Sequence, residues 1–167
     1  KQFGKITTDY ALLQLASAPA QASLKTTVAI AWLRQGQEDK FRASIDEALK
    51  AKADHVPALI ELVRASAQRG NIDEALAGLD KIPRQSSGAD EAHKLRGDLL
   101  LYGKRDMDAA MVAYRDALQV NPSYLEGQAA VVQLLLLQGK TEAAAEALQG
   151  LAKAAPGKPQ TLYLQAM

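Results

Sequence analysis

The feature of this 167-residue chain that most constrains its fold is an internal repeat with a step of about 34 residues. Glycines that follow apolar stretches stand at Gly36, Gly70 and Gly139, so the first two lie one step apart and the last two close to two steps apart. Small residues on the same grid are Ala75, Ala110 and Ala144. A unit this short cannot bury its own apolar face, so we expect successive units to stack on one another.

Residues 125–158 show what one unit contains. Two apolar stretches, 129–137 and 141–154, flank a short segment centred on Gly139, and the second stretch ends near Pro156. Glycine is the residue favoured just past a helix end, and proline does not continue a helix. The chain also holds 32 alanines and 24 leucines, both strong helix formers. Each unit is therefore predicted to be a helix, a tight turn and a second, antiparallel helix.

The grid predicts a single array that occupies residues 1–167. We expect a leading helix over about 8–16, ending at Pro19, as the close of a preceding repeat in 1–21. The remaining segments are four repeats and the start of a further one, over 22–55, 56–89, 90–124, 125–158 and 159–167. The chain begins with lysine rather than methionine, and we interpret it as a piece of a longer protein.

Three positions depart from the grid. Phe41 stands where other units carry alanine, so we expect either a splayed first helix pair or a ring that points toward the preceding helix. Arg105 is interpreted as a one-residue insertion in the third turn. Pro83 is expected to cut short the second helix of the second repeat, ahead of a polar loop over 84–88.

The repeat resembles the tetratricopeptide repeat, whose unit has the same length as the step found here. The best match runs from Asn121-Pro122-Ser123-Tyr124 through Gln138-Gly139-Lys140 and Ala144 to Pro156. The resemblance implies an all-α fold, a right-handed α-α superhelix of antiparallel helix pairs. It also implies that the first helix of each repeat lines a concave face that binds a partner.

Carried onto this sequence, the resemblance gives a set of candidate partner-binding residues from the four first helices. They are Ser23, Thr26, Thr27, Ile30 and Arg34; Ile60, Glu61, Arg64 and Gln68; Glu91, Lys94, Asp98 and Tyr102; and Glu126, Ala129, Gln133 and Leu137. This mixture of charged, apolar and aromatic side chains suits an extended peptide or a partner helix. The alternative is that these residues are only the solvated stripe of helices packed elsewhere.

A narrower resemblance is to the repeat lipoproteins of bacterial exosortase (PEP-CTERM) systems, which accompany exopolysaccharide genes. It rests on His93-Lys94-Leu95-Arg96-Gly97, on Ala113-Tyr114-Arg115-Asp116-Ala117-Leu118 and on 121–124. It implies a periplasm-facing lipoprotein of the bacterial envelope, while the residues themselves leave a cytoplasmic location open.

Several classes of function are disfavoured by composition. A net charge of +1 and an aromatic content of 5% disfavour a nucleic-acid partner. No apolar run approaches the roughly 20 residues that span a bilayer. There is no cysteine, and the two histidines lie far apart, so no catalytic, metal or cofactor site is predicted.

The leading hypothesis is a non-enzymatic scaffold that binds a protein or peptide on its concave face, in envelope protein sorting or exopolysaccharide export. A second hypothesis is a regulatory or substrate-recruiting arm of a larger enzyme, such as a glycosyltransferase. A third is a self-association module that dimerises through exposed repeat ends.

Overall fold

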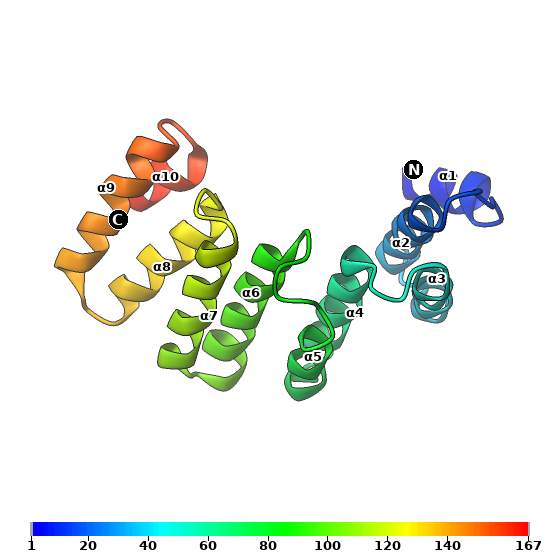
Figure 1. Cartoon of the computed structure of the whole chain (residues 1–167), viewed down its shortest axis with the longest axis horizontal. Helices are drawn as coiled ribbons and strands as arrows, with labels where there is room; N and C mark the ends of the chain where they lie inside the picture. Colours follow the sequence, from blue (N-terminus) through cyan, green and yellow to red (C-terminus); the bar gives the residue numbers. More distant parts are fainter. Residues whose placement is uncertain (1, 167) are drawn as a thin grey trace. The chain divides into compact units, whose positions relative to one another are not determined.

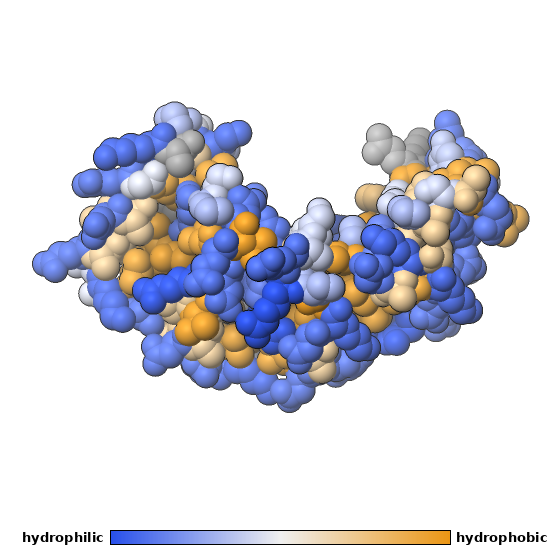
Figure 2. Space-filling model, viewed as in Figure 1, coloured by the Kyte–Doolittle hydropathy of each residue, from blue (hydrophilic) through white to orange (hydrophobic). Residues whose placement is uncertain are grey.

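The computed structural model describes residues 2–166, and all regular structure in that range is helical (Figure 1). The chain divides into two compact parts, an N-terminal unit, Lys1–Ile82, and a C-terminal unit, Pro83–Met167. On the face drawn in Figure 2, hydrophilic side chains surround smaller hydrophobic patches in each unit. The all-α fold expected from the repeat is confirmed.

The N-terminal unit contains two helix pairs preceded by a short helix. Its helices are α1 (Gln2–Tyr10), α2 (Ala18–Arg34), α3 (Glu38–Ala51), α4 (Val56–Gln68) and α5 (Ile72–Leu79). Helix α2 packs on α3, and α4 packs on α5 (Figure 1). Helix α5 has only eight residues and ends before Pro83, as the sequence predicts.

The prediction of a leading helix over 8–16 is wrong. Helix α1 ends at Tyr10, and residues 11–17 form an irregular segment. Pro19 lies in the first turn of α2, where its missing N–H costs nothing, and the Ser17 side chain accepts a hydrogen bond from the Ala20 N–H. Pro19 therefore marks the start of a helix, not the end of one.

Phe41 is fully buried in the core of the N-terminal unit. Its cluster includes Ala22 and Ala29 from α2 and Ala58 and Ala65 from α4. The ring thus faces the preceding helix, which is one of the two outcomes that its size predicts. Small residues on the facing helices provide the volume that the ring fills.

The C-terminal unit also contains two helix pairs, followed by a short helix. Its elements are α6 (Ala89–Asp98), the π-helical segment η1 (Leu99–Lys104), α7 (Met107–Val120), α8 (Leu125–Leu137), α9 (Thr141–Ala154) and α10 (Pro159–Gln165). Helix α6 packs on α7, α8 packs on α9, and α10 contacts both α8 and α9.

The predicted small residues of the grid are buried where the helices of a pair meet. Ala75 of α5, Ala110 of α7 and Ala144 of α9 are each at most 2% exposed. Alanine at these points lets two helix axes approach to roughly 8–10 Å. The recurrence of small residues at these three positions of the grid therefore has a packing cause.

The turns inside the helix pairs share one backbone geometry. Gly36, Gly70 and Gly139 all have φ between 70° and 81°. After Gly139, the Lys140 N–H donates to the Leu135 carbonyl, and the Gly139 N–H donates to the Leu136 carbonyl. This pair of bonds satisfies carbonyls that the helix end leaves free, and it requires the left-handed backbone that glycine adopts without strain.

Arg105 takes the glycine position in the third of these turns. Its φ is 59°, and the Asp106 N–H donates to the Leu100 carbonyl. The extra residue of this repeat is therefore not accommodated in the turn itself, which corrects the prediction. It is absorbed before the turn by η1, since a π-helical turn holds one residue more than an α-helical one.

Candidate functional site

The candidate site lies in the C-terminal unit, on the face shared by α6, η1 and α8. Lys94, Asp98 and Tyr102 follow one another at every fourth position, so they lie on one face of α6 and η1. Glu126 and Gln133 are separated by two helical turns on α8, which places them on one face of that helix. The family resemblance implies that these residues belong to the partner-binding face.

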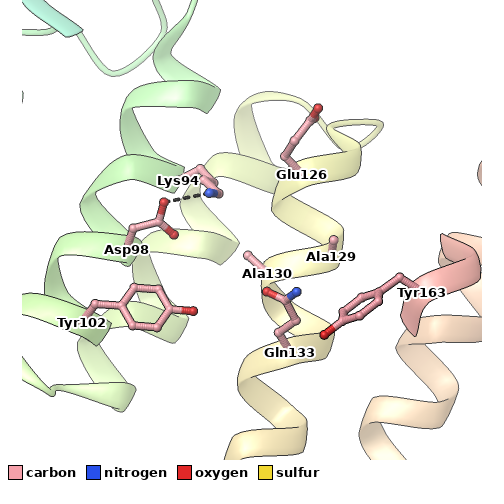
Figure 3. A pocket seen from close by; sticks show the side chains of 8 residues that line it. All are labelled: Lys94, Asp98, Tyr102, Glu126, Ala129, Ala130, Gln133 and Tyr163. Atoms are coloured by element: carbon pink, nitrogen blue, oxygen red, sulfur yellow. Dashed lines mark hydrogen bonds and ion pairs between the residues drawn. The ribbon is translucent and has the colours of Figure 1, made fainter. Parts of the chain in front are cut away.

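The structure brings these residues together around one hollow of about 270 Å³. Its lining consists of Lys94, Asp98, Tyr102, Glu126, Ala129, Ala130, Gln133 and Tyr163. Figure 3 shows the Tyr102 and Tyr163 rings on opposite sides of Gln133, with their hydroxyl groups directed toward it. The buried alanines of α8 leave open the space that larger side chains would fill.

Asp98 is the centre of a hydrogen-bonded network at one wall of the hollow. Its Oδ2 lies 2.7 Å from Lys94 Nζ (Figure 3). Its Oδ1 accepts a hydrogen bond of 2.9 Å from the Tyr114 hydroxyl. Burial, followed by the neighbouring Asp98 charge, raises the pKa of Tyr114 above its usual value, so this phenol stays a donor. Both carboxylate oxygens of Asp98 are therefore engaged within the chain.

Gly97 makes this network possible. A Cβ at this position would lie 2.3 Å from Tyr114 Cε1, well inside contact distance. The absence of a side chain therefore lets the Tyr114 ring, which is only 1% exposed, lie against the backbone of α6.

Negative charge gathers at the start of α8, next to the hollow. Burial is the main cause that raises the pKa of Tyr124 to about 12, and the charges of Glu126, Glu91, Asp90 and Asp98 add to it. Within the described part of the chain, Glu126 is exposed and has no hydrogen-bond or ion-pair partner. Its carboxylate is therefore available to a ligand.

Other predicted residues lie outside this hollow. Thr26 and Ile60 are buried, at 4% and 3% exposure, so their assignment to a partner-binding surface is corrected. The Thr26 hydroxyl donates to the Ala22 carbonyl of its own helix, and Ile60 belongs to the core face of α4. Both helices present a wider buried face than the sequence pattern indicates.

The remaining predicted residues of the N-terminal unit keep some exposure. Arg64 Nη1 and Glu61 Oε1 form an ion pair of 2.7 Å on α4. The others are the exposed Ser23, Thr27, Arg34 and Gln68 and the half-buried Ile30. A hollow of about 150 Å³ in this unit lies between α4 and α5 and is lined by none of the predicted residues. In the C-terminal unit, Glu91 and Leu137 lie outside the lining of the 270 Å³ hollow.

Tyr163 and Ala130 are the lining residues that the sequence prediction does not include, and Tyr163 is the one with a functional side chain. It lies on α10, one repeat step after Ala129 and two steps after Lys94, so it continues the same series of positions. The repeat step is sufficient to predict a partner-facing residue at position 163, but the face predicted from the sequence ends before residues 159–167.

Residues 2–166 contain no group of three or more histidine, aspartate or glutamate side chains placed to hold a metal ion. None of the helices in this range combines the length and the apolar character needed to cross a membrane.

Leu12, Leu13 and Leu15, between α1 and α2, are exposed. Dimerisation through exposed repeat ends stays a prediction.

Comparison with known proteins agrees with this architecture. Residues 33–99 match the model of a family described as "Tetratricopeptide repeat". The matched segment covers less than half of the chain, from the end of α2 into η1. A structure of MamA from Desulfovibrio magneticus RS-1 has a TM-score of 0.61 at 16% identity, covering 83% of this chain and 77% of that one. Together, the family match and such likenesses support the tetratricopeptide-repeat superfamily.

Two further matches come from larger proteins. "Cellulose synthase operon protein C" of Pseudomonas fluorescens (strain SBW25) is 27% identical over 152 residues, which cover 87% of this chain and 12% of that protein. A human IFIT1 dimer with PPP-AAAA has a TM-score of 0.65 at 18% identity, covering 89% of this chain and 35% of that one. At such identity the second match shows the fold alone. None of these matches names an exosortase system, so that narrower resemblance stays a prediction.

Proposed function

We propose that this tetratricopeptide-repeat chain is a non-enzymatic binding module that holds an extended segment of a protein partner on the α6–η1–α8 face. The observation that carries this proposal is the hollow lined by Lys94, Asp98, Tyr102, Glu126 and Gln133. These five residues come from two separate repeats, and the family resemblance implies that they belong to the partner-binding face. Exposed tyrosine rings beside polar groups are typical of protein-binding surfaces.

The chemistry of the hollow favours binding over catalysis. Its one half-buried carboxylate, Asp98, is held by Lys94 and Tyr114. A carboxylate engaged on both oxygens is poorly placed to move a proton to or from a substrate. The polar groups of Glu126, Gln133 and the two tyrosines belong to exposed residues and are suited to contacts with a ligand.

The biological setting that we propose is bacterial exopolysaccharide export in the cell envelope. The support is the relative named as a cellulose synthase operon protein. The chain spans 12% of that relative, so the partner is proposed only as a protein of such a system.

The experiment that tests this function is affinity capture from the envelope fraction of an exopolysaccharide-producing host. Three baits are compared: the native chain, a Tyr102→Ala/Tyr163→Ala double variant, and a Tyr10→Ala variant. Tyr10 is an exposed tyrosine of α1, so it controls for the loss of a phenol outside the hollow. Captured proteins are identified and then titrated singly, as purified proteins, against each bait.

We expect a protein encoded with the exopolysaccharide machinery to bind the native chain and the Tyr10→Ala variant equally. The double variant should bind it at least tenfold more weakly, because it removes both aromatic walls of the hollow. Equal affinity for all three baits would contradict the assignment of binding to this face.

A further inference from the structure

Resting on the proposed function, a more specific inference concerns which partner side chain enters the hollow. Its volume of about 270 Å³ is just below the range of roughly 300–1,000 Å³ that is typical of sites for whole small molecules. The space therefore suits one long side chain of a partner, with the rest of the partner outside.

The charge of the hollow is negative. Lys94 is the cation of the lining, and its ammonium group lies 2.7 Å from Asp98, so its charge is locally compensated. Glu126 is left as an uncompensated carboxylate in the lining. The potential at the start of α8 is therefore complementary to a cation and unfavourable for an anion.

The two tyrosines add a second reason to expect a cation. Tyr102 is 69% exposed and Tyr163 is 60% exposed, so both rings are accessible to a ligand. They come from different elements, η1 and α10, and lie on opposite sides of the hollow (Figure 3). A guanidinium group binds tyrosine rings by stacking and cation–π attraction, which an ammonium group does less well.

We infer that this hollow binds an arginine side chain of the partner, held between Tyr102 and Tyr163 and attracted by the uncompensated charge of Glu126. Gln133 lies on α8 between the two rings (Figure 3). Its amide oxygen can accept a hydrogen bond from the same guanidinium group. The partner segment that lies on the α6–η1–α8 face is accordingly basic. A neutral sugar also stacks on tyrosine rings, and it is the competing occupant that the test must separate.

The test uses fluorescence anisotropy with the full chain and a labelled peptide of alternating arginine and serine. A second peptide carries citrulline in place of arginine, which keeps the shape and removes the charge. Glu126→Gln is compared with Glu142→Gln, because Glu142 is an exposed glutamate in the first turn of α9, outside the hollow. The two variants lose the same formal charge at equivalent helix positions. Cellohexaose is titrated in parallel.

The arginine peptide should bind at least fivefold more tightly than the citrulline peptide. Glu126→Gln should weaken arginine-peptide binding about fivefold and reduce its salt dependence, while Glu142→Gln changes neither. Tyr102→Ala should also weaken arginine-peptide binding, because it removes a stacking surface and leaves the charge unchanged.

Equal binding of the two peptides, or equal losses from Glu126→Gln and Glu142→Gln, would overturn the inference. Binding of cellohexaose that depends on Tyr102, without binding of the arginine peptide, would assign the hollow to a saccharide instead. These failures are distinguishable from failure of the proposed function. In these cases the captured partner would still bind the Tyr102→Ala/Tyr163→Ala variant more weakly than the native chain.

Discussion

The two units of this chain place different side chains at equivalent positions of one repeat. Lys94 and Asp98 in the C-terminal unit correspond, one repeat step earlier, to Ile60 and Arg64 in the N-terminal unit. Ile60 is buried in the core, and Arg64 pairs with Glu61 along its own helix. The repeat step therefore determines which helix face a residue occupies. The type of side chain determines whether that face is packed into the core or lines a hollow.

The units also differ in how their cores accommodate an irregular residue. In the N-terminal unit, Phe41 is accommodated by alanines on facing helices. In the C-terminal unit, the large ring is Tyr114, and Gly97 provides the space for it. In both units, a large side chain on one helix thus packs against a small residue on a neighbouring helix. The small residues are alanines in the N-terminal unit and a glycine in the C-terminal unit.

Removal of the Phe41 ring should have the largest effect on stability. Phe41→Ala leaves a cavity in the N-terminal core and should lower the free energy of unfolding by about 3–5 kcal/mol. The matched control is Phe3→Ala, since Phe3 is 43% exposed on α1. Urea denaturation followed by circular dichroism measures both. A loss for Phe41→Ala no larger than that for Phe3→Ala would contradict the described core.

A side chain at Gly97 tests the corresponding contact of the C-terminal unit. Gly97→Ala should destabilise the protein by about 1–3 kcal/mol, because its Cβ overlaps the Tyr114 ring. Gly150→Ala is the control, since Gly150 lies in α9 with nothing within 4 Å of its added Cβ. That change should stabilise by roughly 0.5–1 kcal/mol through helix propensity. Stabilisation by both substitutions would show that Tyr114 does not lie against α6.

The turn at Arg105 offers a substitution that should increase stability. Arg105→Gly relieves a left-handed backbone at a residue with a Cβ and should stabilise by about 1 kcal/mol. The reciprocal change, Gly139→Ala, introduces the same strain at an open position and should destabilise by a similar amount. Thermal unfolding of the two variants measures the pair. Changes of the same sign would refute the shared turn geometry.

The smallest expected effect is on the pH dependence of stability. Burial, and then the charge of Lys52, lower the pKa of His55 below its usual value of 6.5, while Asp54 opposes them. The unfolded chain then binds the proton more readily, so the contribution of His55 is fully present above about pH 6.5 and is lost as pH falls through the folded pKa. The free energy of unfolding should therefore fall more between about pH 7.5 and 5.5 for the native chain than for His55→Gln. A steeper loss in the variant would reverse the assignment.

The parts of this fold that follow from periodicity were predictable from the sequence. The period of Gly36, Gly70 and Gly139 predicts the helix pairs, and the alanines on the same grid predict the close contacts inside them. The residues around the hollow were predicted as one face, because the family resemblance implies that the first helix of each repeat lines the partner-binding surface. Their arrangement around a common space was not, since it depends on packing between separate repeats.

The errors have local physical causes. Pro19 was assigned to a helix end because proline is tolerated both in a first turn and beyond a last one. Thr26 and Ile60 were assigned to the surface because a helical stripe does not reveal how wide its buried side is. The insertion near Arg105 was assigned to the turn, since a sequence step alone does not locate an extra residue within a helix.

The most direct test of the central claim is photo-crosslinking from two matched positions. Benzoylphenylalanine replaces either Tyr102 in the C-terminal unit or Gln68, which lies one repeat step earlier on α4 and is also exposed. Each chain is irradiated with the partner that the capture experiment identifies. The account predicts a crosslinked complex from position 102 and none from position 68. A crosslink from position 68 alone would contradict the assignment of binding to the α6–η1–α8 face.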